Sequence, residues 1–312
     1  MITIIMPVYN GGKYIVDTIN SVLNQSFRDF NLIVVDDGSS DDTLSLVKEI
    51  SKSDTRVKYT SDINRGVASA RNIGLSLVET KYISFVDSDD RLHPDFLISL
   101  LNRAEETGSE IVTCNYLYVK NNSTKIVDVY RGERPESYIK SLLGSDLWGV
   151  LWNKLFLTSF IRKNGLNFID GINVWEDLLF SISCYSHAKK IAHVDEGLYI
   201  YISRENSLVT KKTTLESIDE MLFVIDKISI ISSVVNNYVN ELNGMKLGAK
   251  NNLLMDRDLY DYSRWISNEN ISIKYIINSK TSLKIKIFAL FAYFHLQVVN
   301  DLIIYLKNKV SR

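Results

Sequence analysis

The chain has 312 residues, 46% of them hydrophobic, so it is long enough to bury one large core or two smaller ones. Its 36 Lys and Arg residues nearly balance its 37 Asp and Glu residues, which argues against a nucleic acid or another polyanion as a partner. The two cysteines, Cys114 and Cys184, lie far apart without metal-ligand spacing, which favours buried thiols in a reducing compartment.

The N-terminus predicts a strand at residues 2–6. It has no basic region before the apolar run and no small-residue cleavage site, so it does not resemble a secretory signal. No window reaches the roughly 20 apolar residues that a transmembrane helix needs. We therefore expect a cytoplasmic protein.

Strands and helices alternate through the first 120 residues. Apolar runs predict strands at residues 2–6, 32–35, 57–60, 82–86 and 110–119. Helical spacing of apolar residues follows each of the first four, and Ser40 is placed to cap the second helix. Such alternation is typical of right-handed crossovers and of an α/β fold whose mostly parallel sheet is flanked by helices.

The pattern weakens after residue 120. Residues 138–143 and 158–164 are predicted to be helical, a further helix begins near Trp175, and residues 191–194 and 198–202 resemble a pair of strands. Strand signals stop at about residue 211. We therefore expect an α/β domain at 1–211, with a regular half at about 1–120 and a less regular half at about 121–211, and a helical region at 212–312.

Three acids follow the strand at residues 82–86, namely Asp87, Asp89 and Asp90. A buried strand does not tolerate unpaired carboxylates, so they are expected beyond its end, at the edge where ligands of parallel sheets bind. Asp87 and Asp89 supply hard oxygen ligands for a divalent cation that holds a diphosphate. The alternative is an exposed acidic turn, and Asp90 fits a helix cap.

A second acidic loop, residues 36–39, follows the strand at residues 32–35. A carboxylate here either caps the next helix or accepts the imide N–H of a uracil. The chain contains neither a Gly-x-Gly-x-x-Gly motif nor a phosphate-binding Gly-x-x-x-x-Gly-Lys-Ser/Thr loop.

Five motifs in order resemble glycosyltransferase family 2. They are Pro7-Val8-Tyr9-Asn10, Val35-Asp36-Asp37-Gly38-Ser39, Asn64-Arg65-Gly66 with Ala70-Arg71-Asn72, Phe85-Val86-Asp87-Ser88-Asp89-Asp90 and Trp175-Glu176-Asp177. The resemblance covers roughly residues 1–207. It implies that the domain at 1–211 is catalytic, with a nucleotide-sugar half at about 1–120 and an acceptor half at about 121–211. It implies a GT-A (Rossmann-like) fold, a nucleotide-diphosphate sugar donor, usually a UDP-sugar, Mn²⁺ or Mg²⁺, and transfer with inversion at the anomeric carbon.

The resemblance also implies roles for individual residues, from the donor pocket to the catalytic base. Pro7, Tyr9 and Asp37 line the uracil pocket, Asn64 and Arg71 lie near the nucleoside or diphosphate, Asp89 is the main metal ligand, Asp87 supports ribose or metal, and Asp177 is the catalytic base. Glu176 is the alternative base. Acids in a first helical turn are also favoured by the helix dipole without catalytic duty.

Other residues are open to two interpretations. Trp148, Trp152 and Trp175 either form an aromatic platform for an acceptor sugar or belong to the core. Lys154 either reaches a phosphate or is a solvated lysine, and Arg204 either contacts the donor diphosphate or is a surface-loop residue.

The last apolar stretch, residues 287–305, predicts one helix with lysines near both ends. It fits an anionic membrane surface, a homodimer interface or packing on the catalytic domain, and its apolar residues nearly encircle it.

The expected function is metal-dependent, inverting transfer from a UDP-sugar to a glycan or lipid-linked glycan in bacterial surface-polysaccharide synthesis, in the cytoplasm or at the inner face of the cell membrane. A polyprenyl-phosphate sugar synthase and a non-catalytic glycan-binding module of the same fold are the alternatives.

Overall fold

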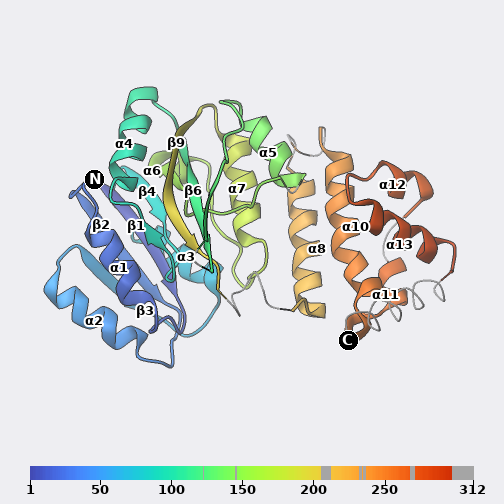
Figure 1. Cartoon of the computed structure of the whole chain (residues 1–312), viewed down its shortest axis with the longest axis horizontal. Helices are drawn as coiled ribbons and strands as arrows, with labels where there is room; N and C mark the ends of the chain where they lie inside the picture. Colours follow the sequence, from blue (N-terminus) through green and yellow to red (C-terminus); the bar gives the residue numbers. More distant parts are fainter. Residues whose placement is uncertain are drawn as a thin grey trace. The chain divides into compact units, whose positions relative to one another are not determined.

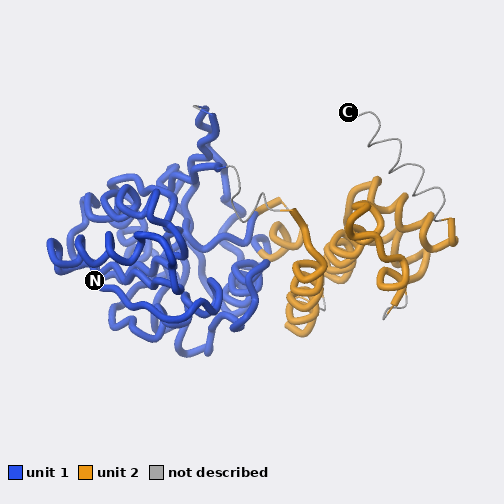
Figure 2. The backbone as a smooth tube through the Cα atoms, turned by 90° about the horizontal axis from the view of Figure 1, so that it is seen from below, with its two compact units in different colours: residues 1–138, 148–210 blue, residues 139–147, 211–312 orange. Residues whose placement is uncertain are grey.

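The computed structural model describes residues 1–121, 123–144, 146–204, 212–231, 234, 237–267 and 271–296. The chain divides into two compact units, residues 1–138 with 148–210 (unit 1) and residues 139–147 with 211–312 (unit 2), coloured in Figure 2. Residues 139–147 cluster with unit 2, whereas the sequence pattern assigns them to the first domain.

Unit 1 is built on a mixed sheet that holds nine strands within the described residues (Figure 1). The strands are β1 (Ile2–Val8), β2 (Phe30–Asp36), β3 (Val57–Ser61), β4 (Tyr82–Phe85), β5 (Arg91–Leu92), β6 (Ile111–Lys120), β7 (Ser123–Val127), β8 (Lys154–Leu157) and β9 (Ile191–Ile202). Their order is β3-β2-β1-β4-β8-β6-β9-β5, and β7 pairs with β6. Neighbouring strands are parallel among β1 to β4 and between β6 and β9, while β5, β7 and β8 run antiparallel to their neighbours.

Helices flank this sheet, as the alternating pattern predicts (Figure 1). They are α1 (Ile15–Leu23), α2 (Thr43–Ser53), α3 (Val67–Ser76), α4 (Phe96–Thr107), α5 (Pro135–Leu143), α6 (Thr158–Lys163) and α7 (Glu176–His187), and the division between the units falls within α5. Every residue of β1 is buried, which explains its continuous apolar sequence: a central parallel strand is covered on both faces. The α/β architecture with a mostly parallel sheet is confirmed.

The strand pair predicted at residues 191–202 is wrong, because β9 is one continuous strand. Its register against β6 shifts where Cys114 pairs with Val194 and Asn115 pairs with Gly197. The shift leaves Asp195 and Glu196 as an irregularity within the strand. Two adjacent acids resemble a turn in the sequence, although here they interrupt a ladder without ending it.

Ser40 does not cap α2. The N-cap position belongs to Asp42, whose side chain makes no capping hydrogen bond. The Ser40 hydroxyl instead donates to Asn10 Oδ1 at 3.3 Å, so this serine joins two loops.

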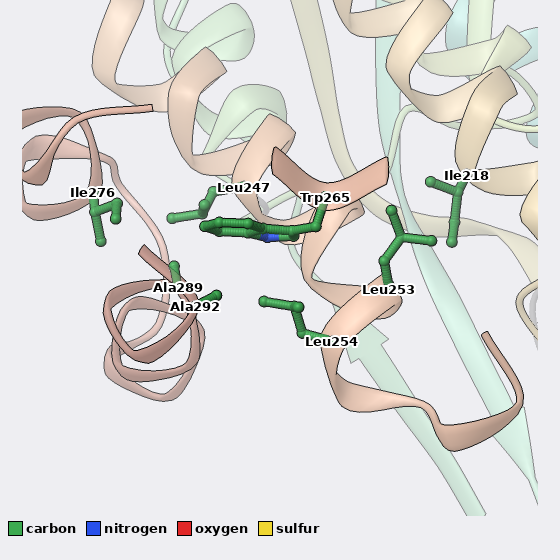
Figure 3. Close-up of a cluster of buried hydrophobic side chains, with 8 residues drawn as sticks. All are labelled: Ile218, Leu247, Leu253, Leu254, Trp265, Ile276, Ala289 and Ala292. Atoms are coloured by element: carbon green, nitrogen blue, oxygen red, sulfur yellow. The ribbon is translucent and has the colours of Figure 1, made fainter. Parts of the chain in front are cut away.

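Unit 2 holds only helices within its described residues. They are α8 (Leu215–Ser229), α10 (Val239–Met255), the 3-10 helix η2 (Arg257–Leu259), α11 (Tyr262–Ile266), α12 (Ile273–Asn278) and α13 (Leu283–Tyr293). Their core contains the fully buried indole of Trp265, together with Leu247, Leu253 and Leu254 of α10 (Figure 3). The indole N–H donates to Asn251 Oδ1 at 3.0 Å, so the one polar atom of this ring is satisfied.

The helix predicted at residues 287–305 ends early, because α13 stops at Tyr293. His295 adopts a left-handed φ of 57°, and its N–H donates to Ala292 O at 3.0 Å. The Leu296 N–H donates to Phe291 O at 2.8 Å, which completes a helix-terminating turn of the Schellman type. Residues 297–305 lie outside the described residues. Among the described helices, none has the length and apolarity that a membrane crossing requires.

Candidate functional site

Hydrogen bonds join the loops that follow β1 and β2. The Asn10 N–H donates to Ser39 Oγ, and the Ser40 N–H donates to Asn10 Oδ1, both at 2.8 Å. Asn10 has a φ of 51°, a left-handed conformation that asparagine tolerates better than most residues. Pro7 lies at the buried end of β1, and Tyr9 beyond it is exposed. The fold thus brings the first two motifs together at the carboxyl edge of the sheet.

Asp37 holds the loop of the third motif. Its buried carboxylate accepts the N–H groups of Arg65 at 2.8 Å and Gly66 at 2.9 Å. Gly38 has a φ of 74°, and a Cβ there would lie 2.7 Å from the Asn64 backbone nitrogen, so this contact requires glycine. The loops that carry Asp37 and Asn64 are therefore neighbours, as expected, and Asp37 already has two backbone partners.

Asp90 ties the acidic turn after β4 to β9. The hydroxyl of the buried Tyr199 donates to Asp90 Oδ2, and the Ile202 N–H donates to Asp90 Oδ1, both at 2.9 Å. The Asp87 N–H donates to the same Tyr199 oxygen at 3.2 Å. The expectation that Asp90 caps a helix is wrong, since both of its oxygens hold β9. Burial raises the pKa of Asp90 well above its ordinary value.

Arg71 joins the acidic turn to the start of α7. This guanidinium is only 8% exposed, and its Nη1 lies 2.6 Å from Glu176 Oε1 while its Nη2 lies 3.5 Å from Asp87 Oδ1. The resemblance places Arg71 near the nucleoside or diphosphate; in the structure its charge faces these two carboxylates. The acidic turn after β4 and the first residue of α7 thus share one cation.

Two carboxyls of this cluster titrate close to neutrality. Burial, reinforced by the charges of Asp89 and Asp177 and opposed by Arg71, raises the pKa of Asp87 to about 6. Burial and the charge of Asp177 raise the pKa of Glu176 to about 7. Clustered acids with shifted pKa values in one place are typical of functional sites.

Asn72 anchors the loop that leads into α7. Its side chain donates to Phe168 O at 3.0 Å and accepts the Phe168 N–H at 2.9 Å. It also donates to Asp170 Oδ1 at 2.9 Å, an oxygen that Ser69 bonds as well. Asn72 belongs to the third motif, but the sequence does not indicate which distant loop it holds.

The start of α7 is fixed by close backbone packing. Trp175, its N-cap, is half-buried and has a left-handed φ of 63°, which is costly for an aromatic residue. Asp177 follows in the first turn, with its Oδ1 accepting the Leu178 N–H at 2.7 Å. A Cβ on Gly149 would lie 2.4 Å from Leu178 Cα, so the loop carrying Gly149 lies directly against α7 beside Asp177.

Lys154 lies in the interior. It is 4% exposed, and its ammonium donates to Val150 O and to Asn153 Oδ1, the latter at 2.8 Å. Burial, opposed by the charge of Asp177, lowers its pKa to about 8. Neither interpretation from the sequence describes it, because it is neither solvated nor directed at an exposed phosphate site. It is a buried cation near Asp177.

Arg204 faces the acidic turn. Its Nη1 lies 2.6 Å from Asp89 Oδ2, and its guanidinium carbon lies 4.0 Å from the centre of the Tyr14 ring. The Asp89 side chain remains 39% exposed. Arg204 therefore belongs to the cluster around the acidic turn and is not a free surface-loop residue. Residues 205–211 lie outside the described residues.

The acids offer a partial ligand set for a cation. Within the described part of the chain, no group of three or more His, Cys, Asp or Glu side chains is placed to hold a metal ion. Asp87 and Asp89 are two partly exposed carboxylates, and Asp89 already binds a cationic group, the guanidinium of Arg204. Two carboxylates fit Mg²⁺ or Mn²⁺ when the phosphates of a substrate complete the coordination.

A parallel α/β sheet with a polar cluster beyond its strand ends defines a class of folds that bind nucleotides at this edge. The family model for glycosyl transferase family 2 matches residues 3–163. The chain therefore belongs to glycosyl transferase family 2.

Individual relatives agree with this assignment. The chain is 31% identical to the putative glycosyltransferase EpsH of Bacillus subtilis over 217 residues, 67% of this chain and 63% of EpsH. It is 28% identical to TarP of Staphylococcus aureus, a poly(ribitol-phosphate) β-N-acetylglucosaminyltransferase, over 93% of each chain. The match thus spans less than two thirds of EpsH, and likewise of EpsJ from the same organism, at 62%.

The solved structure of S. aureus TarS residues 1–349 with UDP-GlcNAc superposes with a TM-score of 0.71. It covers 97% of this chain and 89% of that chain at 21% identity. This likeness confirms the GT-A type of fold.

Proposed function

We propose that this protein is an inverting glycosyltransferase that moves a sugar from a UDP-sugar to a hydroxyl group of a bacterial surface glycan. The observation that carries the proposal is the Arg71 bridge, which joins donor-side Asp87 to Glu176 beside Asp177. Transfer needs a group that stabilises the leaving diphosphate and a base for the acceptor in one place, and this bridge supplies the connection. All residues of the site belong to unit 1, which we infer to be the catalytic domain.

Asp177 is the proposed base. The neighbouring Glu176 is only 10% exposed and its Oε1 is bound to Arg71, so it is poorly placed to reach an acceptor hydroxyl. In the reaction the acceptor hydroxyl gives its proton to the Asp177 carboxylate while its oxygen bonds the anomeric carbon. The bond from that carbon to the diphosphate oxygen breaks, and UDP leaves with the electron pair.

Asp89 and Asp87 are the residues that would hold Mn²⁺ or Mg²⁺. When bound, the ion would neutralise charge on the leaving diphosphate. Asp89 is the more accessible of the two, and both carboxylates remain in reach of solvent. Asp87 also pairs with Arg71, so it would position this guanidinium as well as bind the metal ion.

Arg204 is a proposed diphosphate contact. Its guanidinium pairs with Asp89, and it would exchange this carboxylate for the donor phosphates, which guanidinium groups bind through paired hydrogen bonds. Pro7, Tyr9, Asp37 and Asn64 are proposed to line the nucleoside pocket, since they lie on loops joined at the same sheet edge.

Similarity to TarS and TarP supports the proposed donor and the proposed role in polymer synthesis. TarS has been solved with UDP-GlcNAc and with UDP, and TarP is by name a poly(ribitol-phosphate) β-N-acetylglucosaminyltransferase. These findings support a UDP-sugar donor and a role in cell-wall or surface polymer synthesis for this chain.

The test is donor turnover by the Asp177→Asn variant. With Mn²⁺ and a panel of UDP-sugars, the wild-type chain is expected to release UDP from at least one donor. Asp177→Asn should lower that rate by about 10²-fold or more while leaving UDP affinity within about twofold, because a general base contributes about 10²–10⁴ in rate. Unchanged turnover in this variant would transfer the role of base to Glu176. A wild-type chain that turns over no nucleotide sugar would contradict the proposal.

A further inference from the structure

A ladder of aromatic rings runs from the acidic turn to the surface of unit 1. Tyr199 and Tyr201 project from the same side of β9, and Tyr116 and Tyr118 are their register partners on β6. Trp152 stacks on Tyr199, with ring centres 4.2 Å apart and planes inclined by 16°. The inner end of the ladder is thus the tyrosine whose hydroxyl holds Asp87 and Asp90.

The outer end of the ladder is accessible. Tyr201 contacts Trp152 at 5.8 Å and stacks with Tyr118 at 5.6 Å, while Trp148 meets Tyr201 edge-on at 5.8 Å. Trp152 is buried, Tyr118 is half-buried, and Trp148 is 47% exposed. Core packing accounts for Trp152, whereas Trp148 and Tyr118 keep solvent-accessible ring surface where they contact Tyr201.

The outer rings are carried by segments that contact α7 beside Asp177 and the acidic turn after β4. Trp148 precedes Gly149, whose backbone packs against Leu178, the residue that follows Asp177. The Ser181 hydroxyl of α7 donates to Gly149 O at 2.7 Å, which fixes this contact. On the other side, Tyr201 directly precedes Ile202, whose N–H donates to Asp90 Oδ1 of the acidic turn at 2.9 Å.

We infer that Trp148, Tyr118 and Tyr201 form the acceptor subsite and that the acceptor is a pyranose sugar whose C–H face packs on these rings. This inference rests on the proposed function and adds the class of acceptor. Flat aromatic surfaces suit the apolar face of a sugar ring, and the carboxylates beside them accept hydrogen bonds from its hydroxyls. A linear polyol phosphate has no such face. Of the three tryptophans considered from the sequence, Trp148 is the contact, and Trp152 is the buried ring that stacks with Tyr201.

The test is saturation-transfer NMR on the full chain with UDP and Mg²⁺. The probes are methyl β-D-glucopyranoside, methyl β-D-galactopyranoside, methyl N-acetyl-β-D-glucosaminide and, as the linear comparison, ribitol 5-phosphate. At least one pyranoside is expected to receive saturation, strongest on its ring C–H protons. Trp148→Ala and Tyr118→Ala should each weaken it at least about fivefold, and Tyr118→Phe should retain it, because the ring face makes the contact.

Tyr59→Ala is the matched control. Tyr59 is an exposed tyrosine on β3, an edge strand of the sheet that pairs with neither β6 nor β9. It should leave the pyranoside signal unchanged. Saturation of ribitol 5-phosphate alone, no saturated pyranoside, or equal signals in wild-type and Trp148→Ala protein would each overturn the inference. UDP affinity is measured in parallel: its absence contradicts the proposed function, whereas its presence without pyranoside binding contradicts only the acceptor subsite.

Discussion

Three charged residues at the centre of the site are held by one another. Arg71 neutralises both Asp87 and Glu176, and loss of this partner would leave the nearly buried charge of Glu176 unpaired. The bridge gives the two acids of α7 different roles in the proposed mechanism. Glu176 pairs with Arg71, and Asp177 acts as the base. Lys154 adds a second buried positive charge near Asp177.

At this scale we predict that Lys154→Met changes the pH dependence of stability. The folded-state pKa of Lys154 is lowered from 10.5 to about 8, so between these values the unfolded chain binds more protons than the folded chain. The wild-type free energy of unfolding should therefore rise relative to that of Lys154→Met, by roughly 2–3 kcal/mol from about pH 7 to about pH 10. Denaturant unfolding of both proteins at several pH values measures the difference.

The groups that face Lys154 are Asp177, Cys114 and Cys184. The thiols have pKa values raised by burial and Asp177 is an acid, so Lys154 is the member of this group expected to titrate in that alkaline range. A stability difference that does not vary with pH would show that the ammonium is not buried as described.

At the scale of elements, α7 is placed by the loop that packs against it. Gly149 allows backbone-to-backbone contact with Leu178, and Asn72 of α3 holds the loop that enters α7. A few tight contacts between distant segments thus set the position of Asp177.

We predict that Gly149→Ala separates donor binding from turnover. The new Cβ would lie 2.4 Å from Leu178 Cα, a backbone atom, so α7 must shift. We expect a loss of about 1–3 kcal/mol in stability by the usual cost of overpacking, and at least about a tenfold fall in donor turnover with UDP affinity within about threefold. Gly248→Ala is the control, since its nearest neighbour would be 3.9 Å away. Wild-type turnover in Gly149→Ala would mean that this contact does not position the base.

The sequence predicts the elements of unit 1 better than their connections. Strands such as β1 are continuous apolar runs because both of their faces are buried, and this signal is local. The pairing of Arg71 with Glu176 joins residues 105 positions apart, and no local pattern encodes it. The irregularity in β9 could not be predicted for a related reason. The strand continues through its polar residues because it pairs with β6, and the sequence does not show this pairing.

At the scale of the whole molecule, the site lies in unit 1 and unit 2 has its own core. Residues 139–147 and 211–312 group around helices whose largest buried side chain, within the described residues, is Trp265. The sequence motifs that resemble family 2 end near residue 207, so they indicate no functional residue in unit 2. The termination of α13 after Tyr293 likewise depends on His295, a residue type without a strong stop signal.

We predict that Trp265→Ala destabilises unit 2 without weakening the donor site. Removing a buried tryptophan costs about 3–5 kcal/mol, and here it also takes the indole partner from Asn251. UDP affinity with Mn²⁺ should stay within about twofold at temperatures below unfolding, while Ile266→Ala, at an exposed neighbour, should change little. Calorimetric unfolding and UDP titration report the two effects, and a parallel loss of both would place part of the donor site in unit 2.

The most direct test of the central claim is isothermal titration of UDP with the wild-type chain and with Asp89→Asn, each in Mn²⁺ and in EDTA. We predict that the wild-type chain binds UDP with Mn²⁺ at least about tenfold more tightly than in EDTA, and that Asp89→Asn abolishes this difference. Asp29→Asn, at an exposed acid before β2, should behave as wild type. Absence of UDP binding to the wild-type chain, or binding that neither Mn²⁺ nor Asp89→Asn alters, would contradict a metal-dependent nucleotide-sugar site at Asp89.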